Sequence, residues 1–184
     1  MRTTPVRRNE KCFAWTEWMR FIVLLIFTAF SSKAYAIEEC DTLGSLEADP
    51  LAISEPVKFH DIQGAKLIEF CTMAISKQNE GLPRYHLLRA RGYLSSGSFE
   101  EAESDITHSH DMGYAAATFA LATLHHFGEA MPQDLIKAAT LYEKAYNDGV
   151  TWAARGLSIL YNDFSFTSYD PTLSKEWLRR FEND

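Results

Sequence analysis

The strongest constraint on the fold lies in the centre of the chain, in residues 115–149. The first part of this stretch, 115–127, is apolar on most of its circumference, which is typical of a helix that is covered on two sides. Gly128 then offers the left-handed conformation that commonly ends a helix. Asp134 starts a second helix as its N-cap, and apolar residues recur at three- and four-residue steps until Gly149. Because two such helices cannot bury their apolar faces alone, the pattern predicts similar helices on both sides.

The same pattern recurs at an offset of 36 residues. Gly113 and Gly149 are separated by this offset, and so are Asp134 and Asp170, which precedes Pro171 as the next predicted N-cap. The offset also relates Ala117 to Ala153, Leu121 to Leu157, and Leu124 to Leu160. A period of about 30 to 45 residues with two helices per unit is typical of an α-solenoid, in which each unit contacts mainly its neighbours.

Upstream of the central stretch, further helices are predicted. Helical spacing begins near Ile62, Pro83 starts a second helix, and an S-x-x-E capping box at Ser98 starts a third. The sequence therefore predicts an all-α fold over residues 62–184, a short α-solenoid of about three helix-turn-helix repeats. Residues 37–61 contain no sustained helical period and are predicted to form an N-terminal loop.

Residues 1–36 have the pattern of a secretory signal peptide. Five basic residues precede an apolar run over residues 21–30, and Ala34 and Ala36 place small side chains where signal peptidase reads them. We therefore expect cleavage after Ala36 and a periplasmic or secreted protein. Ten apolar residues are too few to cross about 30 Å of hydrocarbon. No stable membrane insertion is expected after cleavage, and an uncleaved N-terminal anchor is the alternative.

Removal of this signal peptide makes the chain strongly acidic. The signal contains six of the 18 Lys and Arg residues and two of the 25 Asp and Glu residues. The other 148 residues then hold 12 basic and 23 acidic residues, a formal net charge of −11, and suit one domain with its own core. Phosphate binding needs clustered Lys and Arg, so nucleic acid is not an expected partner.

Two cysteines, Cys40 and Cys71, remain after signal removal. An even pair in an exported chain favours a disulfide, which would close a loop of about 30 residues and contribute roughly 3 kcal/mol. Because Cys71 falls on a predicted helix, the bond would tie the N-terminal loop to the helices. The alternative is two unpaired, partly buried thiols.

The central unit resembles a Sel1-like repeat, the longer relative of the tetratricopeptide repeat. The positions that carry the resemblance are Ala117, Leu121, His125 at a usual tyrosine position, Gly128, Asp134, Lys137, Ala138, Leu141, Tyr142, Lys144, Ala145 and Gly149. Those that resemble the tetratricopeptide form are Tyr93, Gly97, Phe99, Glu101, Ala102 and Ile106. The resemblance covers residues 62–181. Its third unit departs from the pattern, because Asn162, Asp163 and Phe164 follow Tyr161 where a glycine is usual.

This resemblance implies a concave groove lined by the first helix of each unit. Carried over to this chain, the groove residues are Arg84, Leu87, Arg91, Phe119, Thr123, His126, Arg155, Ile159 and Asn162. Three arginines on one side of an acidic chain favour a protein or peptide partner with an acidic or C-terminal segment, because arginine pairs with carboxylates through two hydrogen bonds. The alternative is that these arginines balance acidic helices such as residues 100–105.

The sequence contains no motif of catalysis, metal binding or cofactor binding. C-x-x-C, H-E-x-x-H and G-x-S-x-G are absent, as is a glycine-rich phosphate loop. His108 and His110 lie on opposite sides of a predicted helix, and the adjacent His125 and His126 also diverge. Since His125 takes a packing position, His126 is the remaining candidate for contact with a ligand. We expect no catalytic residue, metal or cofactor.

The expected function is a protein–protein interaction module, a scaffold or adaptor that the resemblance places in envelope signalling or assembly. The alternative is an enzyme of the cysteine-rich Sel1-like type, for which cell-wall or β-lactam binding has been proposed. That type carries a cysteine pair in each repeat, and the repeats of this chain do not. A third reading is an assembly unit, because about three helical pairs are near the minimum for stability. The oligomeric state stays open.

Overall fold

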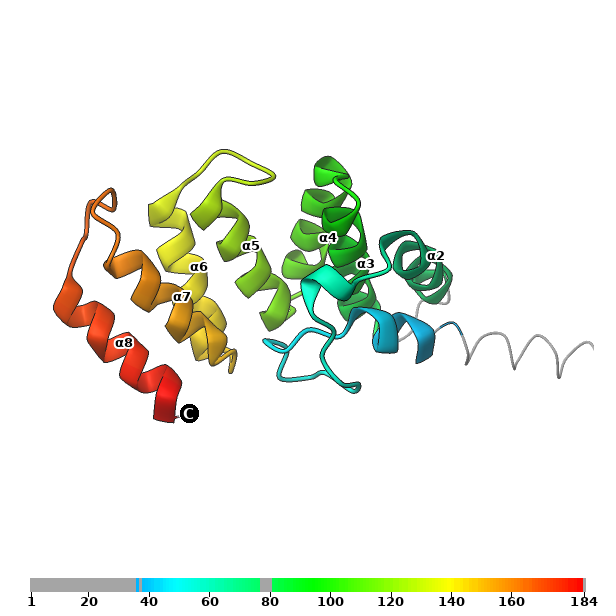
Figure 1. The fold of residues 1–184 in the computed structure, drawn as a ribbon, viewed down its shortest axis with the longest axis horizontal. Helices are drawn as coiled ribbons and strands as arrows, with labels where there is room; N and C mark the ends of the chain where they lie inside the picture. The colour runs from blue at the N-terminus through cyan, green and yellow to red at the C-terminus, as the bar shows by residue number, and fades with distance from the viewer. Residues whose placement is uncertain (1–35, 37, 77–80, 184) are drawn as a thin grey trace, which may run out of the picture. The chain divides into compact units, whose positions relative to one another are not determined.

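The computed structural model describes residues 36, 38–76 and 81–183, and within these ranges it contains helices and loops but no strand. Its elements are the 3₁₀ helix η1 (Phe59–Asp61) and the α-helices α2 (Gly64–Ile75), α3 (Leu82–Ser95), α4 (Phe99–Asp111), α5 (Ala115–Phe127), α6 (Leu135–Asn147), α7 (Trp152–Tyr161) and α8 (Pro171–Asn183) (Figure 1). The all-α prediction is confirmed. Residues 38–44 are also helical, so the prediction that the whole of 37–61 forms a loop is wrong.

Several helix ends follow the local signals in the sequence. The carboxylate of Asp134 accepts a hydrogen bond from the backbone N–H of Lys137 at 2.9 Å, which caps α6. Asp170 caps α8 in the same way, accepting from two backbone N–H groups at 2.9 and 3.0 Å. Gly128 ends α5 with φ of 69°. Ser98, in contrast, makes no side-chain cap hydrogen bond, so the predicted capping box is wrong.

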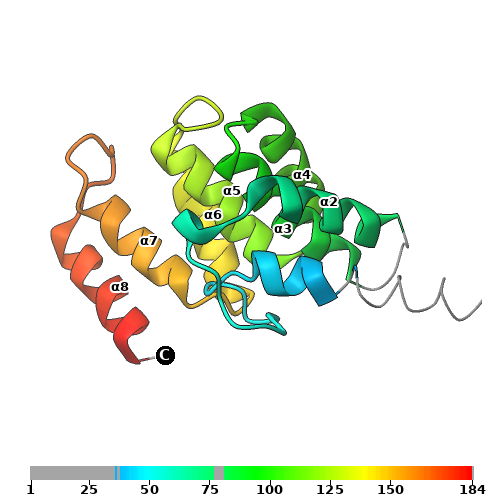
Figure 2. The same cartoon turned by 45° about the vertical axis from the view of Figure 1, so that its right-hand side comes forward.

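Consecutive helices from α2 to α8 pack against one another (Figures 1 and 2). In addition, α3 contacts α5, and α5 contacts α7. The intervening helices α4, α6 and α8 make no such contacts with one another in the described part of the chain. The helices α3, α5 and α7 therefore approach one another more closely than α4, α6 and α8 do.

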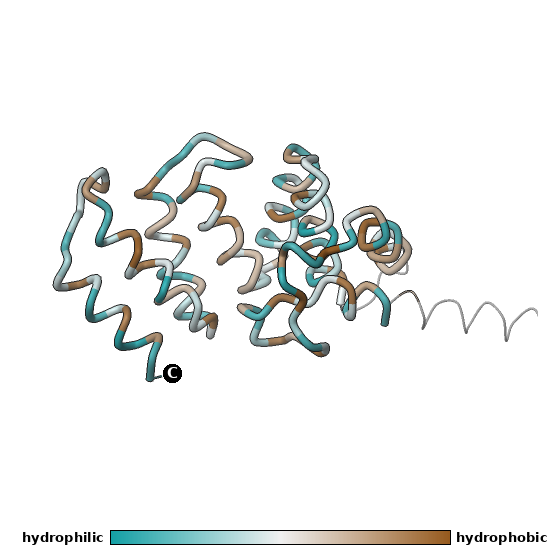
Figure 3. The backbone as a smooth tube through the Cα atoms, in the orientation of Figure 1, coloured by the Kyte–Doolittle hydropathy of each residue, from teal (hydrophilic) through white to brown (hydrophobic). Residues whose placement is uncertain are grey.

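The main apolar core extends from α3 to α8 and depends on small residues at the helix contacts. The helix α5 is the most apolar helix, whereas α8 is largely hydrophilic (Figure 3). In α7, a Cβ added to Gly156 would lie 2.6 Å from the ring of Tyr142 on α6. The missing side chain at Gly156 thus lets the fully buried Tyr142 ring lie directly against the α7 backbone.

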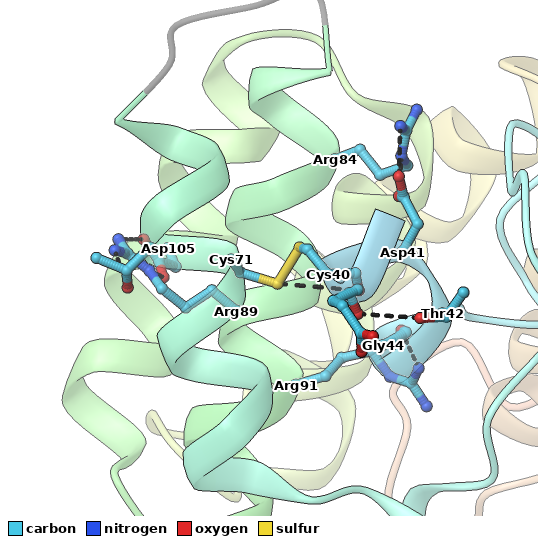
Figure 4. Close-up of a disulfide and its surroundings, with 11 residues drawn as sticks. Cys40, Asp41, Thr42, Gly44, Cys71, Arg84, Arg89, Arg91 and Asp105 are labelled. Atoms are coloured by element: carbon cyan, nitrogen blue, oxygen red, sulfur yellow. Dashed lines mark hydrogen bonds and ion pairs between the residues drawn. A yellow bond between two sulfur atoms is a disulfide. The ribbon is translucent and has the colours of Figure 1, made fainter. Parts of the chain in front are cut away.

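A second, smaller core joins residues 40–44 to α2 and α3. Its centre is the predicted disulfide between Cys40 and Cys71, which the structure confirms and which is fully buried (Figure 4). A Cβ on Gly44 would lie 2.7 Å from the side chain of Leu67 and 3.1 Å from that of Leu88. The backbone at Gly44 is therefore packed directly onto α2 and α3.

A buried ion network joins α3 to α4. The carboxylate of Asp105 accepts two hydrogen bonds from Arg89, at 2.6 and 2.8 Å, and lies 2.7 Å from Nδ1 of His86. Burial alone would raise the pKa of Asp105, but the hydrogen bonds from Arg89 and His86 outweigh it and hold that pKa below its ordinary value. The ionised carboxylate therefore stabilises the α3–α4 contact.

We expect Asp105→Asn to lower the free energy of unfolding by about 3 kcal/mol at pH 7, because it leaves the half-buried Arg89 cation beside a neutral group. Urea denaturation followed by circular dichroism measures the change. The difference from wild type should shrink as the pH falls below about 4, since protonation then removes the wild-type charge as well. The control is Asp111→Asn, at an exposed position on the same helix, with an expected effect below about 0.5 kcal/mol. Equal effects of the two substitutions would contradict the conclusion that the ionised Asp105 carboxylate stabilises the α3–α4 contact.

Candidate binding surface

The α3 face of the predicted groove is covered by the chain itself. Arg84 forms a two-point ion pair with Asp41, with Nε 2.7 Å from Oδ1 and Nη2 3.2 Å from Oδ2 (Figure 4). Leu87 is fully buried in the main core. Neither side chain faces an open groove, so the prediction is wrong for both.

Arg91 is also engaged, and it bonds to main-chain atoms rather than to a carboxylate. Its guanidinium donates to the carbonyl oxygens of Gly44 and Ser45, the second at 2.6 Å, and to that of Val57 at 2.9 Å. Burial lowers the pKa of Arg91 to about 10. Arg91 is only 8% exposed and does not face an open groove, so the prediction of an open groove residue is wrong here too. It holds residues 41–57, which we call the N-terminal segment.

Tyr114 gives the N-terminal segment a third polar attachment. This residue is the N-cap of α5, and its hydroxyl donates a 2.7 Å hydrogen bond to Oδ2 of Asp49. Burial, and then the hydrogen bond to Asp49, raise the pKa of Tyr114 well above its ordinary value, so the phenol stays protonated and remains a donor. The N-terminal segment is thus attached to both α3 and α5.

The α5 residues of the predicted groove are partly turned into the core. Phe119 and Thr123 are half-buried, and the ring of Phe119 lies 5.8 Å from that of Tyr142. His126 is only 4% exposed, and its Nδ1 lies 3.2 Å from the Tyr142 hydroxyl. The prediction that His126 contacts a ligand is therefore wrong, because its ring packs inside the protein.

The α7 residues of the predicted groove are exposed. Arg155 and Asn162 lie at the surface, and Ile159 is 49% exposed. The guanidinium of Arg155 lies over two aromatic rings, 5.4 Å from the centroid of Trp152 and 5.7 Å from that of Phe181. Unlike Arg84 and Arg89, it forms no ion pair with any residue that the structure describes. We use the term α5–α7 surface for Phe119, Thr123, Arg155, Ile159 and Asn162.

A shallow cleft of about 530 Å³ lies elsewhere, between the start of α6 and the loop that follows α7. His125 lines it together with residues 132–137 and 165–167. The His125 ring is buried, as predicted, and both of its nitrogens are shielded from solvent. His125 therefore presents neither nitrogen to a ligand in this cleft.

The other histidines pair with neighbouring side chains. His108 makes an edge contact with His86, and Nδ1 of His110 lies 2.8 Å from the Thr118 hydroxyl. Among the described residues, no group of three or more His, Cys, Asp or Glu side chains is arranged to hold a metal ion.

Comparison with known proteins adds no family assignment. No protein-family model matches this chain, and no curated protein matches it at a significant level. None of the described helices is long and apolar enough to cross a membrane. Of the predicted signal peptide, residues 1–35 lie outside the described residues.

Sequence reasoning missed the residues that close the α3 face. Asp41 and Asp49 belong to a stretch interpreted only as a loop, and Tyr114 follows the glycine that ends the preceding helix. The available signal was Cys40, because a disulfide to α2 brings the acidic residues that follow it near α3, which packs on α2. Trp152 and Phe181, which support Arg155, could be predicted only as apolar helix residues.

The buried histidines predict a loss of stability in mild acid. Burial lowers the pKa of both His125 and His126; nearby Lys137 acts in the same direction on His125, while Asp163 opposes the shift of His126. In the unfolded chain these imidazoles take up protons near pH 6.5, so below that pH the unfolded state binds more protons than the folded state. The free energy of unfolding should therefore fall as the pH decreases from about 6.5.

Urea denaturation at pH 7.5 and pH 5.5 measures this fall. The double variant His125→Gln, His126→Gln should show a smaller decrease between the two pH values than wild type, whatever its stability at pH 7.5. His60→Gln, at an exposed position, should decrease as wild type does. If the double variant loses as much free energy of unfolding between the two pH values as wild type does, His125 and His126 are not the cause of the loss.

Proposed function

We propose that the chain is a short Sel1-like α-solenoid that is exported and binds a segment of another protein at the α5–α7 surface. The observation that carries this proposal is Arg155, which is exposed, held over two aromatic rings and free of ion pairs among the described residues. It lies where the resemblance places a groove residue.

Recurrent hydrogen bonds support the repeat interpretation. The backbone N–H of Asp134 donates to His125 O at 2.9 Å, and 36 residues later the N–H of Asp170 donates to Tyr161 O at 2.9 Å. The bonds that end α4 and α6 also recur at this offset: from Gly113 to His110 and from Gly149 to Tyr146, at 2.8 and 3.0 Å, and from Tyr114 to Ser109 and from Val150 to Ala145, at 3.2 and 2.9 Å. The third unit thus closes its loop like the second, although it lacks the usual glycine.

The layer formed by α3, α5 and α7 supports a binding surface on these helices. In tetratricopeptide-type solenoids the first helix of each unit lies on the inner, concave side, where neighbouring units come closest. The contacts α3 to α5 and α5 to α7, together with the lack of contacts among α4, α6 and α8 in the described residues, agree with this arrangement. The α5–α7 surface is the part of this layer that the N-terminal segment leaves open.

The chemistry of the α5–α7 surface favours a ligand with a carboxylate and an apolar side chain. Stacking over Trp152 and Phe181 orients the Arg155 guanidinium and leaves its N–H groups available for a carboxylate. Ile159, one turn further along α7, offers an exposed apolar contact. An acidic segment or C-terminus of another protein meets both requirements.

The buried disulfide supports export. Disulfides persist in oxidising compartments such as the periplasm or the extracellular space, and the Cys40–Cys71 bond is fully enclosed by the smaller core. Together with the predicted signal over residues 1–36, this favours a periplasmic or secreted protein.

Site-specific photocrosslinking in intact cells tests the binding function. A photoreactive phenylalanine analogue at Ile159 should capture a partner protein, whereas the same analogue at Ile136, an exposed position on α6, should not. Arg155→Glu should reduce the adduct at position 159 at least fivefold, because it replaces the carboxylate-binding cation with an anion. The matched control is Arg179→Glu, the same charge reversal at an exposed position on α8.

Two outcomes would contradict the proposed surface. One is an adduct of equal intensity at positions 159 and 136. The other is an adduct at position 159 that persists with Arg155→Glu while circular dichroism shows a folded protein.

A further inference from the structure

The N-terminal segment is bound to α3 and α5 much as a separate peptide would be bound. Arg84 grips the Asp41 carboxylate at two points, and Tyr114 donates to the Asp49 carboxylate. Arg91 donates to the carbonyl oxygens of Gly44 and Ser45, which lie between these anchors, and to that of Val57, which lies beyond them. Arg84 and Tyr114 thus bind acidic side chains of the segment, and Arg91 binds its main chain.

Apolar packing does not account for the second half of this segment. Ala48 lies in the main core, and Leu46 packs against it. Beyond them, however, Leu51 is 61% exposed and Ile53 is 67% exposed, so the largest apolar side chains of this half face solvent. The second half of the segment therefore buries little apolar surface. From residue 50 onward the segment is held to the helices through Arg91.

The donors themselves belong to two neighbouring helices, and the two arginines share one helix face. Arg84 and Arg91 are seven residues apart on α3, which places them on one helix face. Tyr114 begins the adjacent α5, which contacts α3. Such a set of fixed donors is suited to carboxylates and peptide carbonyls in general, because charge-assisted hydrogen bonds depend on geometry rather than on the identity of the chain that supplies the acceptor.

We propose that Arg84, Arg91 and Tyr114 form a recognition site for an acidic peptide, and that the N-terminal segment fills this site until an acidic segment of a partner displaces it. The site is separate from the α5–α7 surface and does not depend on binding there. The Cys40–Cys71 disulfide sits next to Asp41 and keeps the displaced segment close to the site. The N-terminal segment therefore competes with the partner's acidic segment as a tethered ligand, at an effective concentration of about 1 mM.

A free peptide tests this proposal when the tethered occupant is weakened. The probe is a fluorescently labelled synthetic peptide with the sequence of residues 41–57, and the receptor is the disulfide-bonded chain carrying Asp41→Asn and Asp49→Asn. These substitutions remove the two carboxylates but keep the size of both side chains. Fluorescence anisotropy should show saturable binding of the peptide to this variant, at least tenfold tighter than to wild type, whose own segment occupies the site.

Three controls locate the binding. A peptide with both aspartates replaced by asparagine should bind the variant at least tenfold more weakly. Arg84→Gln added to the variant should remove peptide binding while circular dichroism stays unchanged, because Arg84 lies at the half-buried edge of the site. Arg155→Glu added to the variant should leave peptide binding unchanged, which separates this site from the α5–α7 surface.

The proposal is overturned if the variant binds no peptide. Hydrogen exchange of residues 50–57 then shows which part fails. A released segment without peptide binding means that the face has no affinity for the sequence, and a segment that stays protected means that the two carboxylates do not hold it. Equal binding to wild type and variant would also overturn the proposal, because the peptide would then lie outside the occupied site.

Discussion

Burial of apolar helix faces between neighbours in the chain is the constraint on which the rest of the structure depends. The helix α5 is apolar around most of its surface, and it contacts α3, α4, α6 and α7. Because each contact joins helices that are close in sequence, the core grows by adding one helix at a time. Small residues make this possible, as at Gly156, where the Tyr142 ring takes the space that a side chain would fill.

The first and last described helices of this array are packed in different ways. At the C-terminal end, α8 buries Trp177 and Ser174, and its residues are otherwise largely hydrophilic (Figure 3). At the N-terminal end, α2 is joined by the disulfide to residues 38–44, which bring a small core of their own. The end that contains the disulfide is also the end that carries a long segment with little helix.

Sequence reasoning succeeded where a feature is set by neighbours in the chain. Helix caps at Asp134 and Asp170 and the left-handed Gly128 follow from local chemistry, and the disulfide follows from an even pair of cysteines. It failed at Ser98, where a capping motif was present but its side chain makes no cap hydrogen bond. It also missed the helix over residues 38–44, because that stretch is stabilised by burial against α2 and α3 rather than by a helical pattern of its own.

The three arginines of the predicted groove show that the position of a side chain on a helix could be predicted from the sequence. Whether that side chain is free to bind a ligand could not. Helical spacing correctly places Arg84 and Arg91 on one face of α3, yet what covers that face is a segment about 40 residues away, anchored by Asp41. Arg155 has the same predicted role, but no carboxylate of the described chain reaches it. Availability of a binding residue therefore depends on non-local competition for its hydrogen bonds. Spacing within one helix carries no information on that competition. A disulfide does carry such information, because it fixes where a distant acidic segment must lie.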